Sequence, residues 1–244
     1  MAASAAANMT DMTLPFPDAF VILSGGRAQR LGGSGGPAGT DRTDDADDGG
    51  DAGGTDKASI ALGGRTLLDR ALGTTQGRPV VIVGPHAPAR PRVTLTREDP
   101  PGGGPAAGIA AGVAALPTPS TGQRQRIGIM AVDQAGVTSQ TWQRLSAAAA
   151  DPEVKGCVLV EADRRQYGVG VFDAAALRGA LGTRADWHGI SLRALLDPLI
   201  GAEVEAQGPE ARDIDTPADL DWWRRRAQSV AGSAGSTDGA VISP

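Results

Sequence analysis

The sequence predicts an α/β fold, a mostly parallel sheet with helices on both faces. Short aliphatic and β-branched runs alternate with segments of helical periodicity, which is typical of successive strand and helix units. The chain has 244 residues, of which 41% are hydrophobic, so it is long enough to bury a sizeable core. Such folds bind ligands beyond the carboxyl ends of their strands, and functional residues are expected there.

The elements follow one another in a regular order. The first strand is expected at residues 20–23, where an aliphatic run ends at Gly25 and Gly26. Further strands are expected at residues 79–83, 93–96, 127–132, 157–161, 168–172 and 203–205. Helices are expected at residues 66–72, 105–116, 139–149, 174–181, 191–200 and 217–228. The last helix has a clear start, because Thr216 can cap it, Pro217 suits its first turn and Asp219 completes a capping box.

Three segments fall outside this pattern. Residues 33–55 carry six aspartates among Gly, Ala, Ser, Thr and Pro, a composition that cannot bury a core and predicts a disordered acidic insertion. Residues 229–244, rich in Gly, Ser and Ala, predict a disordered tail, and residues 1–18 predict a loose lead-in. The domain is therefore expected at residues 19–228.

Composition excludes several classes of function. The chain carries 28 acidic and 23 basic residues, a net charge of −5 that argues against a nucleic-acid partner. Its single cysteine, Cys157, lies in an apolar run that predicts a buried strand, and two histidines are too few for a His-rich metal cluster. No window is apolar enough for a membrane helix, and the first twenty residues lack the basic residues of a secretory signal. We therefore expect a soluble cytoplasmic protein with no membrane partner.

The turn after the first strand predicts a phosphate-binding loop. Gly25 and Gly26 can expose backbone N–H groups, and Arg30 adds positive charge. The spacing matches neither the Walker sequence nor the dinucleotide fingerprint. Lys57, one of only two lysines, can reach phosphate oxygens from the end of the acidic segment. On residue types alone, an ordinary glycine turn and a surface lysine remain open as explanations.

Two aspartates predict a metal site at the carboxyl edge of the sheet. Asp133 follows the buried strand of residues 127–132, and Asp215 precedes the last helix without taking part in its cap. Two carboxylates suit Mg²⁺, which takes one or two protein oxygens and completes its shell with water and substrate phosphate. The alternative is that Asp133 only marks the point where the chain leaves the core and returns to solvent.

A loop rich in Gly and Pro, residues 97–108, predicts contact with a nucleobase. Its glycines allow the backbone to approach a flat ligand closely. Asp99 can accept hydrogen bonds from the N–H groups of a guanine edge. A loop built only to turn the chain is the alternative.

In order, these motifs resemble those of molybdenum cofactor guanylyltransferases and the related Rossmann-like nucleotidyltransferases. The signature L-x-G-G-x-[AS]-x-R-[LM]-G-x-D-K matches residues 23–32 and then 56–57. The nucleotide-selecting region matches residues 98–109, the metal aspartate matches Asp133, and the closing motif matches residues 213–220. Each motif is weak alone, but four in the same order are specific.

The resemblance implies a Rossmann-like nucleotidyltransferase fold and transfer of a nucleoside monophosphate to a phosphorylated acceptor. In the closest family, GMP moves from GTP to the phosphate of molybdopterin and pyrophosphate leaves. The acceptor phosphate is expected to attack the α-phosphorus in line, without a covalent intermediate. Mg²⁺ is the implied cofactor, and proteins of cofactor delivery are implied partners.

The resemblance also assigns roles to residues of this chain. The implied nucleotide-binding residues are Leu23, Gly25, Gly26, Arg30, Lys57, Asp99, Gly104 and Asp133. Among these, Arg30, Lys57 and Asp133 are the implied catalytic residues. The implied metal ligands are Asp133 and Asp215.

The chain departs from the family pattern in two places. Relatives keep one residue where this chain has residues 33–55, and the added aspartates are expected to weaken triphosphate binding. After Asp133, residues 134–136 replace a proline-containing turn. A CTP-using enzyme, another phosphorylated acceptor such as phospholactate or a sugar phosphate, and a non-catalytic nucleotide-binding module remain alternatives.

Overall fold

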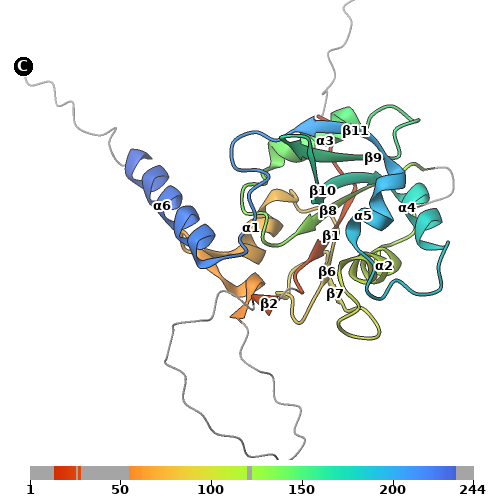
Figure 1. Cartoon of the computed structure of the whole chain (residues 1–244), viewed down its shortest axis with the longest axis horizontal. Coiled ribbons are helices and arrows are strands. Elements are labelled where there is room, and N and C mark those ends of the chain that lie inside the picture. The colour runs from red at the N-terminus through yellow and green to blue at the C-terminus, as the bar shows by residue number, and fades with distance from the viewer. Residues whose placement is uncertain (1–13, 26, 29–54, 120–122, 235–244) are drawn as a thin grey trace, which may run out of the picture.

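The computed structural model describes residues 14–25, 27–28, 55–119 and 123–234, and Figure 1 shows the chain. The strands are β1 (Ala19–Leu23), β2 (Arg27–Ala28), β3 (Thr55–Asp56), β4 (Ala61–Leu62), β5 (Arg65–Thr66), β6 (Val80–Val83), β7 (Val93–Thr96), β8 (Arg126–Ala131), β9 (Gly156–Glu161), β10 (Arg164–Asp173) and β11 (Ile200–Glu205). The helices are α1 (Leu67–Thr74), α2 (Pro105–Ala115), α3 (Ser139–Ala148), α4 (Ala174–Leu181), α5 (Leu192–Leu196) and α6 (Pro217–Ala234), with short 3₁₀ helices η1 (Lys57–Ser59) and η2 (Asp197–Leu199).

Seven strands form the main sheet in the order β11-β9-β10-β8-β1-β6-β7. All neighbouring pairs are parallel except those of β10, which confirms the predicted mostly parallel sheet. Leu23 at the end of β1 is in register with Val83 of β6 and Ala131 of β8. The carboxyl ends of these strands therefore meet at one edge of the sheet.

The antiparallel strand β10 follows β9 through a two-residue turn. Ala162 and Asp163 have φ angles of 47° and 61°. A tight hairpin requires positive φ at both central residues, for which Asn and Gly are the usual signals. Ala-Asp carries a weaker signal, and we expected only the last part of β10, residues 168–172.

Helices cover both faces of the sheet, as predicted. Residues of α1, α3 and the first half of α6 share one core cluster with one face, whereas α2, α4 and α5 pack on the other. Trp142 of α3 is 0% exposed, and its ring lies 5.1 Å from that of Phe20 in an edge-on arrangement. Cys157 is also fully buried, as expected, and burial raises its pKa to about 12.

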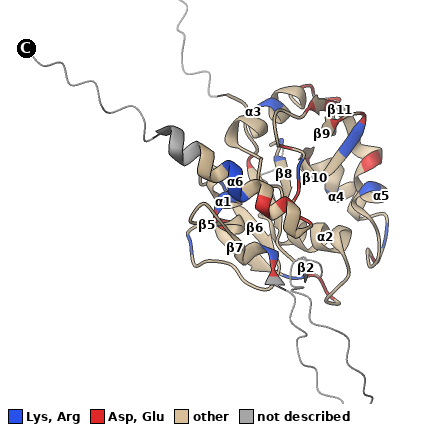
Figure 2. Cartoon of the chain, turned by 60° about the vertical axis from the view of Figure 1, so that its left-hand side comes forward, with Lys and Arg blue, Asp and Glu red and all other residues tan. Residues whose placement is uncertain are grey.

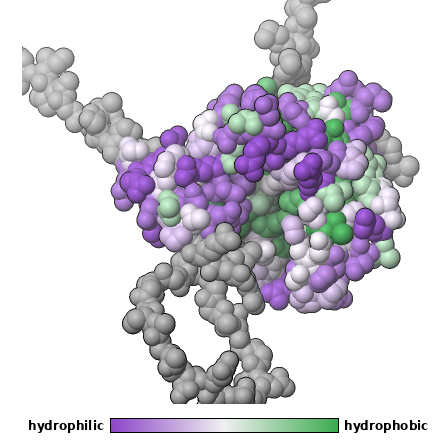
Figure 3. Space-filling view, in the orientation of Figure 1, coloured by the Kyte–Doolittle hydropathy of each residue, from purple (hydrophilic) through white to green (hydrophobic). Residues whose placement is uncertain are grey.

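The last helix, α6, leaves the body of the molecule at its far end. Figures 1 and 2 both show it beside α1, and buried Leu220 and Trp223 fix its first half to the core. Hydrophilic residues dominate the α6 side of the surface in Figure 3. We expected this helix to end at residue 228, but it continues to Ala234, so part of the predicted tail is helical.

Other boundaries also differ from expectation. The lead-in is packed from Phe16 onward, because Phe16 lies 5.8 Å from Phe20 between ring centres and Asp18 accepts a hydrogen bond from the Arg126 backbone N–H at 2.8 Å. The helix expected at residues 191–200 ends early in η2, where Pro198 interrupts it and β11 begins at Ile200. No described helix is long and apolar enough to cross a bilayer.

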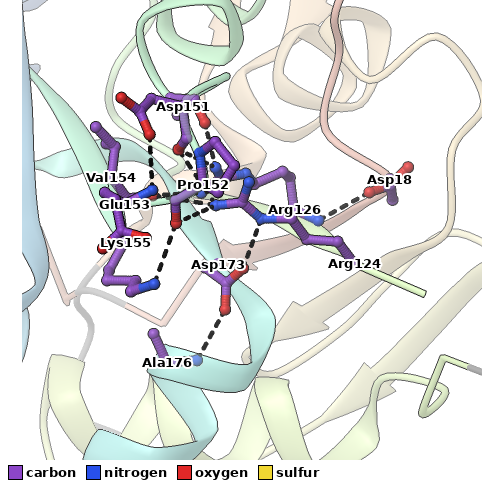
Figure 4. A network of polar contacts seen from close by, with 11 residues as sticks. Asp18, Arg124, Arg126, Asp151, Pro152, Glu153, Val154, Lys155, Asp173 and Ala176 are labelled. Carbon is purple, nitrogen blue, oxygen red and sulfur yellow. Dashed lines mark hydrogen bonds and ion pairs between the residues drawn. The ribbon is translucent and has the colours of Figure 1, made fainter. Parts of the chain in front are cut away.

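A polar network fixes the opposite, amino edge of the sheet (Figure 4). The guanidinium of Arg126 donates to the carbonyls of Ala149 and Val154, which follow α3. The guanidinium of Arg124 pairs with Asp173, whose other oxygen caps α4 at the N–H of Ala176. These contacts lie at the starts of β8 and β9, away from the edge at which a ligand is expected.

Candidate active site

Three side chains that are distant in sequence meet at the carboxyl edge of the sheet. The ammonium of Lys57 donates hydrogen bonds to Asp133 Oδ2 at 2.9 Å and to Asp215 Oδ1 at 2.6 Å. The side chain of Lys57 is only 11% exposed, whereas those of Asp133 and Asp215 are 19% and 56% exposed. A nearly buried ammonium thus joins two carboxylates that face solvent.

Lys57 owes its place to the residue before it. Asp56 caps η1 by accepting a hydrogen bond from the Ala58 backbone N–H at 3.1 Å. The Nε2 atom of His86, which follows β6, lies 3.2 Å from the other oxygen of Asp56. The turn that begins with Lys57 is therefore held from both sides, and this positions the ammonium.

Asp133 is placed by the end of β8. The Val132 N–H donates to the carbonyl of Leu23 at 3.0 Å, which extends the pairing of β8 with β1 by one residue. The chain then turns, and the Ala135 N–H donates to the carbonyl of Asp133 at 2.9 Å. The carboxylate consequently projects beyond the sheet rather than along it.

Charge within this group changes two pKa values. Burial of Lys57 by itself lowers its pKa, but the carboxylates of Asp133 and Asp215 outweigh that effect and raise the pKa above its ordinary value. Desolvation of the Asp213 carboxyl, followed by the negative charges of Asp215 and Asp133, raises the pKa of Asp213. Lys57 is therefore a cation at neutral pH, and negative charge exceeds positive charge around it.

The donor set fits a hard divalent cation. Asp133 and Asp215 each use one oxygen on Lys57, and their second oxygens have no hydrogen bond to another described residue. Because both carboxylates bind one nitrogen, they are held close together. Residues 14–25, 27–28, 55–119 and 123–234 hold no group of three or more His, Cys, Asp or Glu side chains suited to a metal. Two carboxylates match Mg²⁺, which fills its other positions with water and phosphate.

The glycine turn next to this group is built for close approach. A Cβ on Gly84 would lie 2.0 Å from the Oγ of Ser24, so the chain after β6 can pass this close only as glycine. Gly25 follows Ser24, and its N–H donates to the carbonyl of Val83 at 3.2 Å, so the strand pairing already uses an N–H that the sequence predicted to be exposed for phosphate. Leu23 contributes its carbonyl to the pairing with β8, and its side chain lies against α2. Gly26 and Arg30 lie outside the described residues.

The loop between β7 and α2 carries Asp99 and Gly104. The Glu98 carboxylate accepts a hydrogen bond from the Gly102 N–H at 3.1 Å, whereas Asp99 is exposed. Gly104 precedes the first residue of α2 with φ at 88°, a value that favours glycine. β7 lies three strands from β8 in the sheet, and no described hydrogen bond or ion pair joins Asp99 to Lys57, Asp133 or Asp215. The structure therefore does not join Asp99 to the Lys57 group directly.

Sequence reasoning missed two contributors to this site. Asp213 lies two residues before Asp215, and alternate residues of an extended segment share a face, so the Asp-x-Asp spacing was an available signal. His86 lies 30 residues from Asp56, and nothing in the local sequence indicates their contact. Packing explains why residue 136 is a glycine, because a Cβ there would lie 2.2 Å from the carbonyl oxygen of Pro209.

A mostly parallel sheet with a glycine turn, a buried lysine and paired carboxylates at its carboxyl edge is typical of a nucleotidyltransferase of Rossmann-like fold. The family described as MobA-like NTP transferase domain matches residues 20–204, more than half of the chain, and the chain belongs to this family. Comparison with curated proteins finds no match.

Solved structures show the same fold. Molybdopterin-guanine dinucleotide biosynthesis protein A from Archaeoglobus fulgidus is 16% identical, with a TM-score of 0.61 over 88% of this chain and 99% of that one. The 2-C-methyl-D-erythritol 4-phosphate cytidylyltransferase from Thermus thermophilus is 18% identical, with a TM-score of 0.60 over 87% and 99%. Protein Rv0371c from Mycobacterium tuberculosis H37Rv is 19% identical, with a TM-score of 0.60 over 87% and 100%.

Proposed function

We propose that the protein transfers GMP from GTP to the phosphate of molybdopterin and releases pyrophosphate. The observation that carries this proposal is the contact of Lys57 with Asp133 and Asp215 at the carboxyl edge of the sheet. A cation beside two carboxylates is suited to a triphosphate and its metal ion. The family match and the order of the sequence motifs support the same reaction class.

In this proposal the triphosphate lies on the glycine turn and the base lies on the loop of Asp99. Gly26 and Arg30 of the glycine turn hold the phosphates, Gly25 allows them to approach the backbone, and Lys57 offsets their negative charge. Asp133 and Asp215 would hold Mg²⁺, which supplies Lewis-acid stabilisation of charge on the transferred phosphoryl group. Leu23 and Gly104 border the nucleotide at the ends of β1 and the base loop.

The reaction needs no nucleophile from the protein. An oxygen of the acceptor phosphate forms a bond to the α-phosphorus, and the bond from the α-phosphorus to the oxygen that bridges to the β-phosphate breaks. Pyrophosphate carries away the electron pair of the broken bond. Because a phosphate at neutral pH already carries negative charge, the protein contributes position and charge stabilisation rather than a general base.

The nucleotide preference can be measured by thermal shift with GTP, CTP, ATP and UTP, each with MgCl₂. GTP is expected to raise the Tm most, because the Asp99 carboxylate can accept from two N–H groups of guanine. Asp99→Ala should remove that preference while Asp221→Ala, an exposed carboxylate on α6, should keep it. A larger shift with CTP would overturn the guanylyl assignment and favour a cytidylyltransferase.

A further inference from the structure

The residue that carries the central ammonium of the site does not belong to the main sheet. Asp133 follows β8 and the glycine turn follows β1, and both strands lie within the seven-stranded sheet. Lys57 instead begins η1, and the strand before it, β3, pairs only with β2 among the described residues. The position of the Lys57 ammonium relative to Asp133 and the glycine turn therefore depends on how η1 is attached to the edge of the sheet.

Core packing and one polar contact attach η1 to the sheet. Ala58 and Ile60 are 1% and 8% exposed and share a core cluster with residues of β1 and β6, which fixes the end of η1. Contacts of Lys57 itself apart, the described part of the chain shows one polar contact of residues 55–60 with the main sheet or the loop after β6. This contact joins Asp56 to His86.

His86 extends from a point of the chain that is fixed on two sides. The carbonyl of Gly84, directly after β6, accepts a hydrogen bond from the Nε of Arg97 at 3.1 Å. The Oγ of Ser24 donates to the carbonyl of Val83 at 3.2 Å, which ties the end of β6 to the glycine turn. The imidazole is therefore held by the same part of the sheet edge that borders the glycine turn.

Asp56 connects this imidazole to the start of η1. Its Oδ1 atom accepts from the Ala58 N–H at 3.1 Å, and its backbone carbonyl accepts from the Ser59 hydroxyl at 2.8 Å. Its Oδ2 atom is buried and has no hydrogen bond to a described residue, and the Nε2 atom of His86 lies 3.2 Å from it. Because a buried carboxylate oxygen is costly to leave unpaired, a proton on this nitrogen stabilises the observed orientation of the carboxylate.

We propose that His86 is a positioning residue for nucleotidyl transfer, which acts through Asp56 on the ammonium of Lys57. This inference rests on the proposed function and adds a residue that lies outside the sequence motifs. A small displacement of a charged group at a reacting centre has a large effect on rate. Loss of the imidazole should therefore slow turnover more than it weakens binding of the triphosphate.

The position of Lys57 can be followed directly, because the chain has only two lysines, Lys57 and Lys155. Full-length protein labelled with ¹³C at the lysine ε-carbons should give two lysine signals, and Lys155→Arg assigns them. In the absence of nucleotide and metal, His86→Ala should move the Lys57 signal toward that of Lys155, which is exposed. The Lys155 signal should stay in place.

Pyrophosphate release with GTP gives a second readout. His86→Ala should lower kcat by about tenfold and change the KM for GTP by less than about twofold. His86→Gln can place an amide N–H near the Asp56 carboxylate, so it should restore both the kcat and the Lys57 signal. In an Asp56→Asn background, His86→Ala should have little further effect, because the two residues act on Lys57 as one unit.

His188→Ala is the matched control, because His188 is the only other histidine, is exposed and lies between α4 and α5. It should leave the kcat and the Lys57 signal unchanged. The imidazole of His86 is 55% exposed, so its replacement should leave the fold intact.

An unchanged Lys57 signal in His86→Ala, or equal effects of the two histidine variants, would overturn the positioning role. A higher KM for GTP with an unchanged Lys57 signal would also overturn it, because His86 would then act on the nucleotide itself. A shifted signal that His86→Gln restores, in a protein that releases no pyrophosphate from any triphosphate, would support the contact with Lys57 and contradict the proposed function.

Discussion

The Lys57 ammonium lies 2.6 Å from the Asp215 carboxylate, although 158 residues separate them in sequence. Asp133, 76 residues from Lys57, completes the group at 2.9 Å. Three segments of the chain, namely η1, the end of β8 and the start of α6, must all be in place for this group to form. The group is therefore a product of the tertiary fold, and its geometry can be tested residue by residue.

Replacing Lys57 tests the charge at the centre of the group. Lys57→Ala should lower kcat for nucleotidyl transfer by about 10²–10³-fold, because it removes a nearly buried cation from the transferring phosphoryl group. Lys57→Arg should restore little, because the larger guanidinium has little room at a nearly buried position where a compact ammonium contacts both carboxylates at 2.9 and 2.6 Å. Steady-state pyrophosphate release with GTP measures both variants. Lys155→Ala, at the only other lysine, is the control, and an equal loss there would contradict the assignment.

Removing the acidic segment tests its effect on the triphosphate. Ala28 and Thr55 are partners in the small β2–β3 ladder, so the described residues on either side of residues 29–54 lie next to each other. Thr55 is thus part of a strand, and the deletion should span residues 33–54. We expect the KM for GTP to fall, most clearly at low salt, because six aspartates are removed. A variant that melts at a much lower temperature or has a higher KM would show that these residues support the fold or the site.

The centre of the main sheet could be predicted because β1, β6, β8 and β9 consist mainly of continuous apolar runs. All seven strands overlap expected positions, although only parts of β10 and β11 were expected, and helices α2 and α4 lie within one residue of expectation. The hairpin that reverses β10 was missed because Ala162 and Asp163 are unusual at positive φ. The small β4–β5 hairpin was missed although Gly63-Gly64 between its strands is a standard turn signal.

The candidate site was only partly predictable. The order of the sequence motifs predicted that Lys57, Asp133 and Asp215 lie together, and the structure shows this contact. Single-residue arguments left a surface lysine open for Lys57 and a return of the chain to solvent open for Asp133. The contacts of His86 with Asp56 and of Arg212 with Trp222 depend on how loops pack, and sequence periodicity carries no information about such contacts.

Asp173, at the amino edge of the sheet, should make the free energy of unfolding depend on pH in the acidic range. Burial alone would raise the pKa of Asp173, but the Ala176 N–H and the Arg124 guanidinium outweigh it and lower the pKa. The stabilising contribution is therefore present above the ordinary aspartate pKa of about 4 and is lost as pH falls through the lower folded value. Asp173→Asn should reduce the free energy of unfolding by about 1–2 kcal/mol at pH 7, and by less at pH 3. Urea titration at the two pH values measures this, and a loss that does not depend on pH would contradict it.

The turn after Asp133 should be sensitive to a single methyl group. A Cβ on Gly136 would lie 2.2 Å from the carbonyl oxygen of Pro209 and 2.6 Å from its carbon, and both atoms belong to rigid backbone. Gly136→Ala should therefore lower stability by about 1–3 kcal/mol. Gly179→Ala on α4 is the matched control, because its Cβ would meet no atom within 4 Å, and it should stabilise the helix by about 1 kcal/mol. Equal melting temperatures for the two variants would contradict this interpretation of the turn.

Pyrophosphate release from GTP by wild type and Asp133→Ala tests the central claim most directly, with a pterin phosphate as acceptor and MgCl₂ varied. Asp133 contacts Lys57 and is one of the two proposed metal ligands. The wild type should release pyrophosphate only when acceptor is present, and the variant should lose activity by about 10²-fold or more at every MgCl₂ concentration. Equal rates for the two proteins would show that the group formed by Lys57, Asp133 and Asp215 does not carry nucleotidyl transfer.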